Sequence, residues 1–118
     1  MGRKVFAIVG DMFFASKIRA TAEGLGVDVF FPRTKQALFE KSANSKPYLI
    51  VMELHNQRLD PMELARELKA TDNLQDVVLL GFFSHVETEL QRNALDAGFD
   101  QVVPRSVFSR DLSKILNG

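Results

Sequence analysis

The sequence predicts an α/β protein in which a parallel five-stranded sheet is covered by helices on both faces. Short runs rich in Val, Ile, Leu and Phe alternate with segments whose apolar residues recur at helical spacing, and this alternation occurs five times. Most of the apolar runs are continuous, as expected for strands buried on both faces. The chain has 118 residues and 46% hydrophobic content, which suits one core. We therefore expect a single domain over residues 1–118.

The expected strands are the apolar runs at 4–10, 27–31, 48–54, 77–83 and 100–104. The expected helices follow them in order at 14–26, 34–42, 61–70, 88–98 and 107–118. In the first helix, Ile18, Ala22 and Leu25 share the inward face, and glycines end it. Five βα units in this length predict a three-layer, flavodoxin-like (βα)5 sandwich with strand order 2-1-3-4-5.

Boundary residues support several of these elements. Pro32 closes the second strand. Asp60 and Pro61 are suited to the N-cap and first position of the third helix. Ser84 and Glu87 have the Ser-x-x-Glu spacing of a capping box before the fourth helix. Helix starts are therefore predicted at residue 61 and, after this box, at residue 88.

Composition excludes several classes of function. Lys plus Arg equals Asp plus Glu at 15 each, so no overall positive field attracts nucleic acid or a membrane surface. The chain has no cysteine and only two histidines, which argues against disulfides and a zinc site. No stretch approaches the ~20 apolar residues of a membrane span. We expect a cytoplasmic protein with no nucleic-acid or membrane partner.

The order and spacing of several segments resemble the receiver domain of two-component response regulators (the CheY-like family) over essentially the whole chain. The stretch PYLIVMELHNQRLDPMEL (47–64) is similar to the family's PDLVLLDLMMPGMDGLEL without a gap. DAGFDQVVPRSVF (96–108) is similar to EAGADDYIPKPF, and IVGDMFF (8–14) overlays IVDDD. The resemblance implies a signalling domain of a phosphorelay, with a phosphorylation site at the carboxyl edge of the sheet.

The resemblance places Glu53 at the phosphoacceptor position, where the family has Asp. Asp11 keeps one position of the family's acidic pair, and Gly10 replaces the other.

Gly81 falls on the Thr or Ser position, for which Ser84 is an alternative. The remaining departures are Arg105 for the lysine, Ser106 for the proline that follows it, Pro61 for the glycine of Asp-Gly, and Val102 for a switching aromatic. These departures are at the positions that the family uses for phosphorylation and metal binding. We therefore interpret the chain as a degenerate receiver.

The resemblance also implies a Mg²⁺ site formed by the acidic pair, the phosphoacceptor and a backbone carbonyl. Here the corresponding ligands are Asp11, Glu53 and the carbonyl of His55. Mg²⁺ demands near-octahedral oxygen geometry, so the missing carboxylate at Gly10 and the longer one at Glu53 predict weak or absent binding. For Asp11, an anion at a helix N-terminus is the competing interpretation. His55 is expected to be exposed rather than a side-chain ligand.

Glu53 and Arg105 together suggest a fixed ion pair, because a guanidinium prefers a planar grip on a carboxylate. The strand ends that carry them flank the same crevice in this topology. We therefore expect direct or water-mediated contact and a structural or phosphate-mimicking role for Glu53. A merely solvated carboxylate and residual phosphoacceptance are the alternatives.

The phenylalanine pairs at 13–14, 30–31 and 82–83 are interpreted as core or edge packing. Phe82 and Phe83 could instead belong to a partner-binding patch at a strand end.

Three functions are considered, in order of preference. The first is a phosphorylation-independent interaction module that binds a protein partner, with a homodimer as one option, through the face of the fourth helix, fifth strand and last helix. The second is an active phosphoryl-accepting receiver. The third is a flavodoxin-like ligand binder, for which the Gly-x-Gly-x-x-Gly phosphate loop is missing after the first strand.

Overall fold

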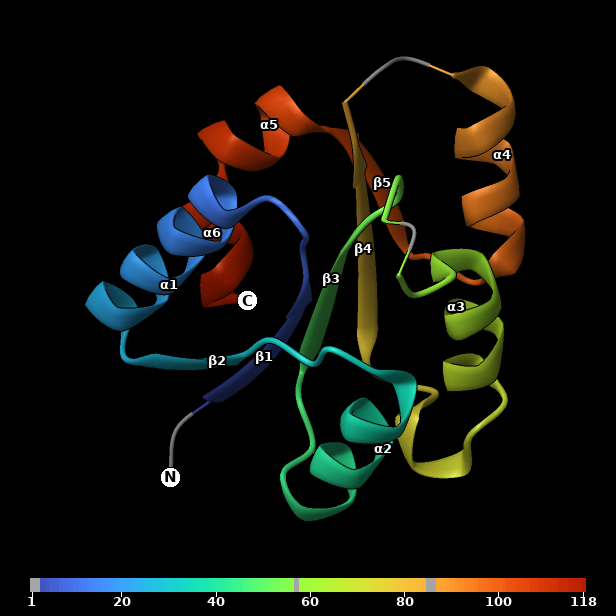
Figure 1. Ribbon diagram of the computed structural model, residues 1–118, viewed down its shortest axis with the longest axis horizontal. Helices are drawn as coiled ribbons and strands as arrows, with labels where there is room; N and C mark the ends of the chain where they lie inside the picture. The colour runs from blue at the N-terminus through green and yellow to red at the C-terminus, as the bar shows by residue number, and fades with distance from the viewer. Residues whose placement is uncertain (1–2, 57, 85–86) are drawn as a thin grey trace.

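The computed structural model describes residues 3–56, 58–84 and 87–118. Its central sheet is parallel and has the order β2-β1-β3-β4-β5 (Figure 1). The strands are β1 (Arg3–Ile8), β2 (Val27–Phe30), β3 (Leu49–Glu53), β4 (Val78–Phe83) and β5 (Gln101–Pro104). The predicted fold class and strand order are confirmed, and each observed strand lies within a residue of its predicted start and within two of its predicted end.

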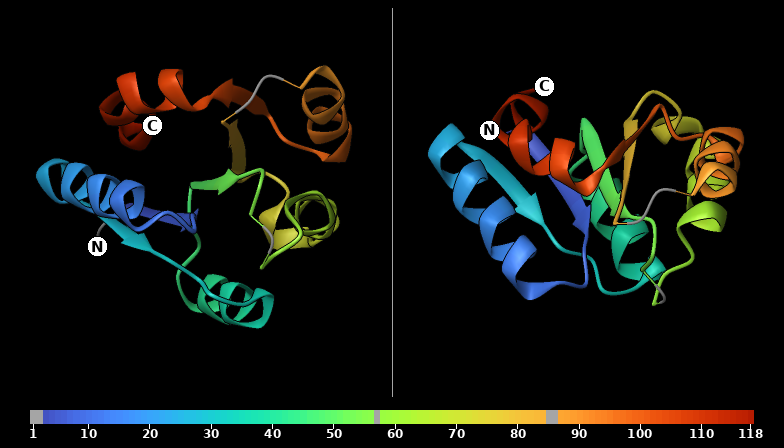
Figure 2. Two further views of the ribbon diagram at one scale, coloured as in Figure 1. Left: turned by 45° about the horizontal axis from the view of Figure 1, so that its top comes forward. Right: turned by 90° about the horizontal axis from the view of Figure 1, so that it is seen from above.

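The helices form a layer on each face of the sheet (Figures 1 and 2). One layer contains α1 (Met12–Leu25), α5 (Arg105–Arg110) and α6 (Leu112–Asn117). The other contains α2 (Lys35–Asn44), α3 (Pro61–Lys69) and α4 (Thr88–Ala97), with a short 3-10 turn, η1 (Asp72–Leu74), after α3. In the part of the chain that the structure describes, no helix is long and apolar enough to cross a membrane.

The two faces of the sheet have separate cores. On the α2, α3 and α4 side, aliphatic residues such as Ile50, Leu64 and Leu68 are fully or almost fully buried. On the α1, α5 and α6 side the core is aromatic near the carboxyl edge, where the rings of Phe82 and Phe108 stack with centroids 4.5 Å apart. Phe14 meets both rings edge to face, at 5.2 and 5.4 Å. Such ring pairs add to the apolar burial, so this cluster fixes α1 and α5 against β4.

Capping explains why α1 and α3 begin where they do. Asp60 is the N-cap of α3, its side chain accepts from the N–H of Glu63, and Pro61 takes the first position, as predicted. Gly26 ends α1 with a φ of 70°, the left-handed conformation that favours glycine. The fourth helix begins at Thr88 as predicted, but the capping box is wrong in its roles: Glu87 is itself the N-cap, with no side-chain hydrogen bond, and residues 85–86 of the box lie outside the described residues.

Other predictions need correction. The single final helix at 107–118 is two helices, because the chain breaks at Asp111 between α5 and α6. Phe82 and Phe83 are buried, so the partner-patch alternative for this pair is wrong and core packing is confirmed. Phe13 is 91% exposed, contrary to the predicted packing, because it lies on the opposite side of α1 from the buried face that carries Phe14 and Ile18.

Candidate functional site

The carboxyl ends of β1 and β3 bring Gly10 and Glu53 together. The two strands are neighbours, with Ile8 opposite Met52 in the parallel register. The chain therefore leaves β1 beside the last residue of β3, and the N–H of Gly10 donates to Oε1 of Glu53 at 2.9 Å. Glu53 is partly exposed. Its carboxylate is held by the backbone of the segment that would otherwise carry a second acidic side chain.

Asp11 has two structural tasks that occupy both of its carboxylate oxygens. Oδ1 accepts the N–H groups of Phe13 and Phe14 at 2.9 and 3.2 Å and so caps α1. Oδ2 accepts from Nη2 of Arg105 at 2.6 Å. The Arg105 guanidinium lowers the pKa of the Asp11 carboxyl, and the N–H of Phe14 acts in the same direction. The anion at a helix N-terminus, considered for Asp11 from the sequence, is therefore present.

Arg105 is held by an aromatic ring as well as by a charge. It is the first residue of α5, and its guanidinium lies 4.6 Å from the centre of the Phe14 ring. Phe14 is in turn part of the cluster with Phe82 and Phe108. The side chain of Arg105 is 37% exposed, so a flat cation packs on a buried ring while it reaches Asp11.

The expected direct ion pair between Glu53 and Arg105 is wrong. Arg105 pairs with Asp11, and among the described residues no ion pair joins it to Glu53. The physical reason is that each side chain has another partner: Asp11 binds Arg105, and the Gly10 amide binds Glu53. Asp11 is the N-cap of α1, the helix that carries the Phe14 ring on which Arg105 packs, whereas Glu53 accepts the N–H of Gly10. The strand order places both strand ends at one crevice, but it does not determine whether Asp11 or Glu53 pairs with Arg105.

At Gly81, the position where the resemblance expects Thr or Ser, the Leu54 side chain occupies the space of a side chain. Gly81 lies on β4, opposite Met52 of β3. A Cβ added to Gly81 would lie 2.7 Å from Cδ2 and 3.1 Å from Cγ of Leu54, which is closer than carbon atoms approach. Leu54 is 6% exposed and belongs to the aliphatic core. Ser84, the alternative hydroxyl, is exposed beyond the end of β4.

The donor set does not fit the Mg²⁺ site that the resemblance implies. Gly10 supplies no carboxylate, both oxygens of Asp11 already accept hydrogen bonds, and one oxygen of Glu53 accepts from a backbone amide. Within residues 3–56, 58–84 and 87–118, no group of three His, Asp or Glu side chains is arranged to hold a metal. A cation at Asp11 would compete with the Arg105 guanidinium for the same carboxylate.

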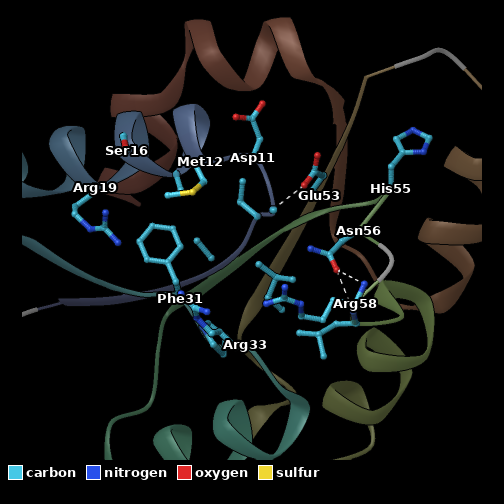
Figure 3. Close-up of a pocket in the computed structure, with 17 residues that line it drawn as sticks. Asp11, Met12, Ser16, Arg19, Phe31, Arg33, Glu53, His55, Asn56 and Arg58 are labelled. Atoms are coloured by element: carbon cyan, nitrogen blue, oxygen red, sulfur yellow. Dashed lines mark hydrogen bonds between the residues drawn. The ribbon is translucent and has the colours of Figure 1, made fainter.

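A cavity of about 570 Å³ opens at this edge of the sheet. Asp11, Glu53 and His55 line it, so the structure brings these predicted residues together (Figure 3). His55 is exposed, and its ring points away from the Glu53 carboxylate in this view. Gly81 and Ser84 do not line the cavity. Arg105 reaches the site only through its contact with Asp11.

The sequence argument missed one component of the cavity. Three arginines line it, Arg19 from α1, Arg33 after β2 and Arg58 after β3. The signal was present in the sequence: Arg33 and Arg58 each follow a strand within a few residues, and the carboxyl ends of parallel strands share one edge.

Solved structures confirm that this fold is the receiver fold. A CheY4 chemotaxis response regulator from Vibrio cholerae matches with a TM-score of 0.82 and 13% identity, over 98% of this chain and 97% of that one. The receiver domain of the sensor histidine kinase PA1611 from Pseudomonas aeruginosa, which has magnesium coordinated in its active-site cleft, matches with a TM-score of 0.81 and 19% identity, over 98% and 95%.

A phosphorylated cyanobacterial phytochrome response regulator, RcpA, matches with a TM-score of 0.80 and 16% identity, over 100% of this chain and 91% of that one. No protein-family model matches the chain, and no curated protein matches it. At these identities the matches establish the fold, and the chemistry has to be argued from the site itself. The chain thus has the CheY-like receiver fold, with a cleft whose polar groups differ from those the receiver resemblance implies.

Proposed function

We propose that this protein is a receiver-like signalling domain that works as a phosphorylation-independent interaction module. The observation that carries the proposal is the ion pair between Asp11 and Arg105. In a receiver, the corresponding acid is expected to hold the metal and the corresponding lysine to contact the phosphoryl group. Here the two charges neutralise each other at 2.6 Å. Neither is available for a phosphoryl group or a metal unless this ion pair is broken, and the other oxygen of Asp11 already caps α1.

Packing and geometry support the same proposal. Phosphoryl transfer depends on positioning and on stabilising the charge of the equatorial oxygens. Glu53 is one methylene longer than aspartate, and Gly81 offers no hydroxyl. Each missing electrostatic partner costs about 3 kcal/mol in the transition state, so several together suppress the reaction strongly. The alternative, an active phosphoacceptor, would need Glu53 to leave the Gly10 amide and react.

Intact mass after incubation with acetyl phosphate and Mg²⁺ tests the proposal. We expect no phosphoryl adduct on the unmutated protein and none on Glu53→Asp, because the shorter carboxylate repairs only one component. An adduct on the unmutated protein that disappears in Glu53→Gln would establish the alternative. A Mg²⁺ titration of the amide spectrum should show no saturable change at low-millimolar concentration, since the donor set is incomplete.

A reconstructed site provides the positive control. The variant combines Gly10→Asp, Glu53→Asp, Gly81→Thr and Arg105→Lys. A Cβ at Gly10 would lie 3.6 Å from Glu53 Oε1, an ordinary contact, so the first change is tolerated. The change at Gly81 requires Leu54 to move, so folding of the variant is checked by circular dichroism. This protein should accept phosphate better than Glu53→Asp alone.

We propose the face of α4, β5 and α5 as the partner-binding surface. Leu95 on α4 is 53% exposed, and Val102 and Val103 of β5 are partly buried. Val102 stands where the resemblance places a switching aromatic, so that side-chain switch is missing from this face. If a second copy of the chain is the partner, Leu95→Lys should weaken the dimer in sedimentation velocity. Phe13→Glu, on the α1 side, is the matched control, and dissociation by that variant alone would move the interface to α1.

A further inference from the structure

The cavity beside Glu53 is polarised, although the whole chain has no net charge. Asp11 and Glu53 lie on one side of it, and Arg33 and Arg58 lie on the other (Figure 3). Arg19 adds a third guanidinium from α1. These arginines belong to segments far apart in the sequence, so the fold has gathered positive charge at one place in a neutral protein.

The arginines of the cavity are not neutralised by direct contact with a carboxylate in the described residues. Within the described ranges, none of Arg19, Arg33 and Arg58 forms an ion pair with a carboxylate. Asp11 is already neutralised by Arg105, which leaves Glu53 as the cavity's one unpaired carboxylate in the described chain. The charge balance of the cavity therefore favours an anion on the arginine side.

The cavity also has apolar walls. Phe31 lies in it with the Arg19 guanidinium 4.7 Å from its ring centre, and Met12, Pro32 and Leu59 are among the other apolar lining residues. Met12 lines the cavity and is 81% exposed, so its side chain is accessible to a group in the cavity. The volume of about 570 Å³ is within the range of small-molecule sites, and such sites combine apolar walls with a few polar groups.

We propose that this cavity binds a small organic phosphate that carries an aromatic ring. Arg33 and Arg58 would hold the phosphate, since the guanidinium fork matches phosphate oxygens in a bidentate manner. The ring would pack in the apolar part of the cavity beside Phe31. This site uses none of the groups that phosphoryl transfer needs, so it goes beyond the interaction role and holds whether or not a partner binds α4, β5 and α5.

The local backbone supports Arg58 as a positioned group. The side chain of Asn56 accepts the N–H groups of Arg58 and Leu59 at 2.9 and 3.0 Å. This turn presents Arg58 at the mouth of the cavity. A concave site of this size favours a small molecule over an extended acidic peptide.

Amide chemical shifts of the full chain, recorded in EDTA at low salt, test the proposal with pyrophosphate, ADP and adenosine as probes. We expect ADP to give saturable shifts at Phe31, Arg33 and Leu59 with a Kd of about a millimolar or less. ADP should bind about fivefold or more tightly than pyrophosphate, because the ring adds apolar contact. Adenosine alone should bind weakest. EDTA removes any role of metal, so the outcome is independent of the phosphorylation experiment.

Two double variants that lose the same charge distinguish ADP binding in the cavity from a general electrostatic attraction of ADP to the protein. Arg33→Gln with Arg58→Gln should weaken ADP binding about tenfold or more. Arg66→Gln with Arg92→Gln removes two exposed arginines from α3 and α4, away from the cavity, and should leave the affinity unchanged. Phe31→Leu should bring ADP down to the affinity of pyrophosphate. Absence of saturable shifts, or equal weakening in both double variants, would overturn the proposal.

Discussion

The carboxyl edge of the sheet is held by different contacts at its α1 end, where the cavity lies, and at its β4 end. At the α1 end the groups are polar and satisfy one another: Asp11 binds Arg105, and Glu53 binds the Gly10 amide. At the β4 end the contact is apolar, because Leu54 occupies the space into which a side chain at position 81 would project.

The neighbours Glu53 and Leu54 serve these two ends separately. Glu53 turns toward β1, whereas the N–H of Leu54 donates to the Phe82 carbonyl at 2.9 Å and continues the pairing with β4. A polar contact near water contributes little net stability, since water can replace it. A buried leucine contributes through area and packing. The apolar end should therefore matter most for stability, and the polar end for charge and pH.

The largest effect is expected at the apolar end. Leu54→Ala should lower the free energy of unfolding by about 2–5 kcal/mol, because a buried leucine leaves a cavity. Gly81→Ala should cost about 1–3 kcal/mol, because its Cβ forces Leu54 out of position. The double variant should cost clearly less than the sum, by about 1 kcal/mol or more, since the clash is removed. Urea unfolding of all four proteins gives the coupling.

Gly24→Ala is the matched control for that cycle. A Cβ at Gly24 meets nothing within 4 Å, and its backbone is helical, so alanine should stabilise α1 slightly. Its effect should add to that of Leu54→Ala without coupling. Additivity at Gly81 as well would show that Leu54 does not fill the space over β4.

The next effect is expected at the ion pair. Arg105 lowers the pKa of Asp11, so Arg105→Gln should raise that pKa toward its ordinary value of about 3.9. A carboxyl whose folded pKa is depressed stabilises the protein above its unfolded pKa and loses that contribution as pH falls through the folded pKa. The stability lost in Arg105→Gln should therefore be full at pH 7 and should shrink below about pH 4.

Carboxyl carbon shifts followed by NMR give the Asp11 pKa directly. Arg110→Gln is the matched control, because Arg110 lowers the pKa of Asp111 and does not contact Asp11. An Asp11 pKa that responds equally to both variants would show that general charge, and not the contact at 2.6 Å, sets it.

The fold was predictable because each of its elements carries its own signal. Five apolar runs and their spacing were enough for the sheet order, and Asp60 with Pro61 was enough for the start of α3. The failures were local. Ser84 and Glu87 have the spacing of a capping box, yet Glu87 is itself the N-cap of α4, so the spacing alone did not identify the capping residue. The break at Asp111 has no proline or glycine to announce it.

The site was predictable in membership but not in pairing. Residue spacing placed Asp11, Glu53 and Arg105 at one edge of the sheet, and all three lie there. Whether Asp11 or Glu53 pairs with Arg105 depends on the Phe14 ring, on which Arg105 packs, and on the Gly10 N–H, which donates to Glu53. Both are tertiary details that strand order does not determine. The pairing of Arg105 with Asp11 is therefore set by tertiary packing.

The smallest effect is expected at Glu53, and it tests that pairing. Glu53→Gln keeps an oxygen that can accept the Gly10 N–H and removes only the charge, so the free energy of unfolding should change by no more than about 0.5 kcal/mol. Glu53→Ala loses the acceptor, but water reaches the exposed amide, so its cost should stay near 1 kcal/mol at most. Urea unfolding at low salt measures both. If Glu53 instead served as the partner of Arg105, Glu53→Gln would destabilise as much as Arg105→Gln, and the two changes together would cost no more than either alone. Near-neutrality of Glu53→Gln, additive with Arg105→Gln, is what a carboxylate bound only to a backbone amide requires.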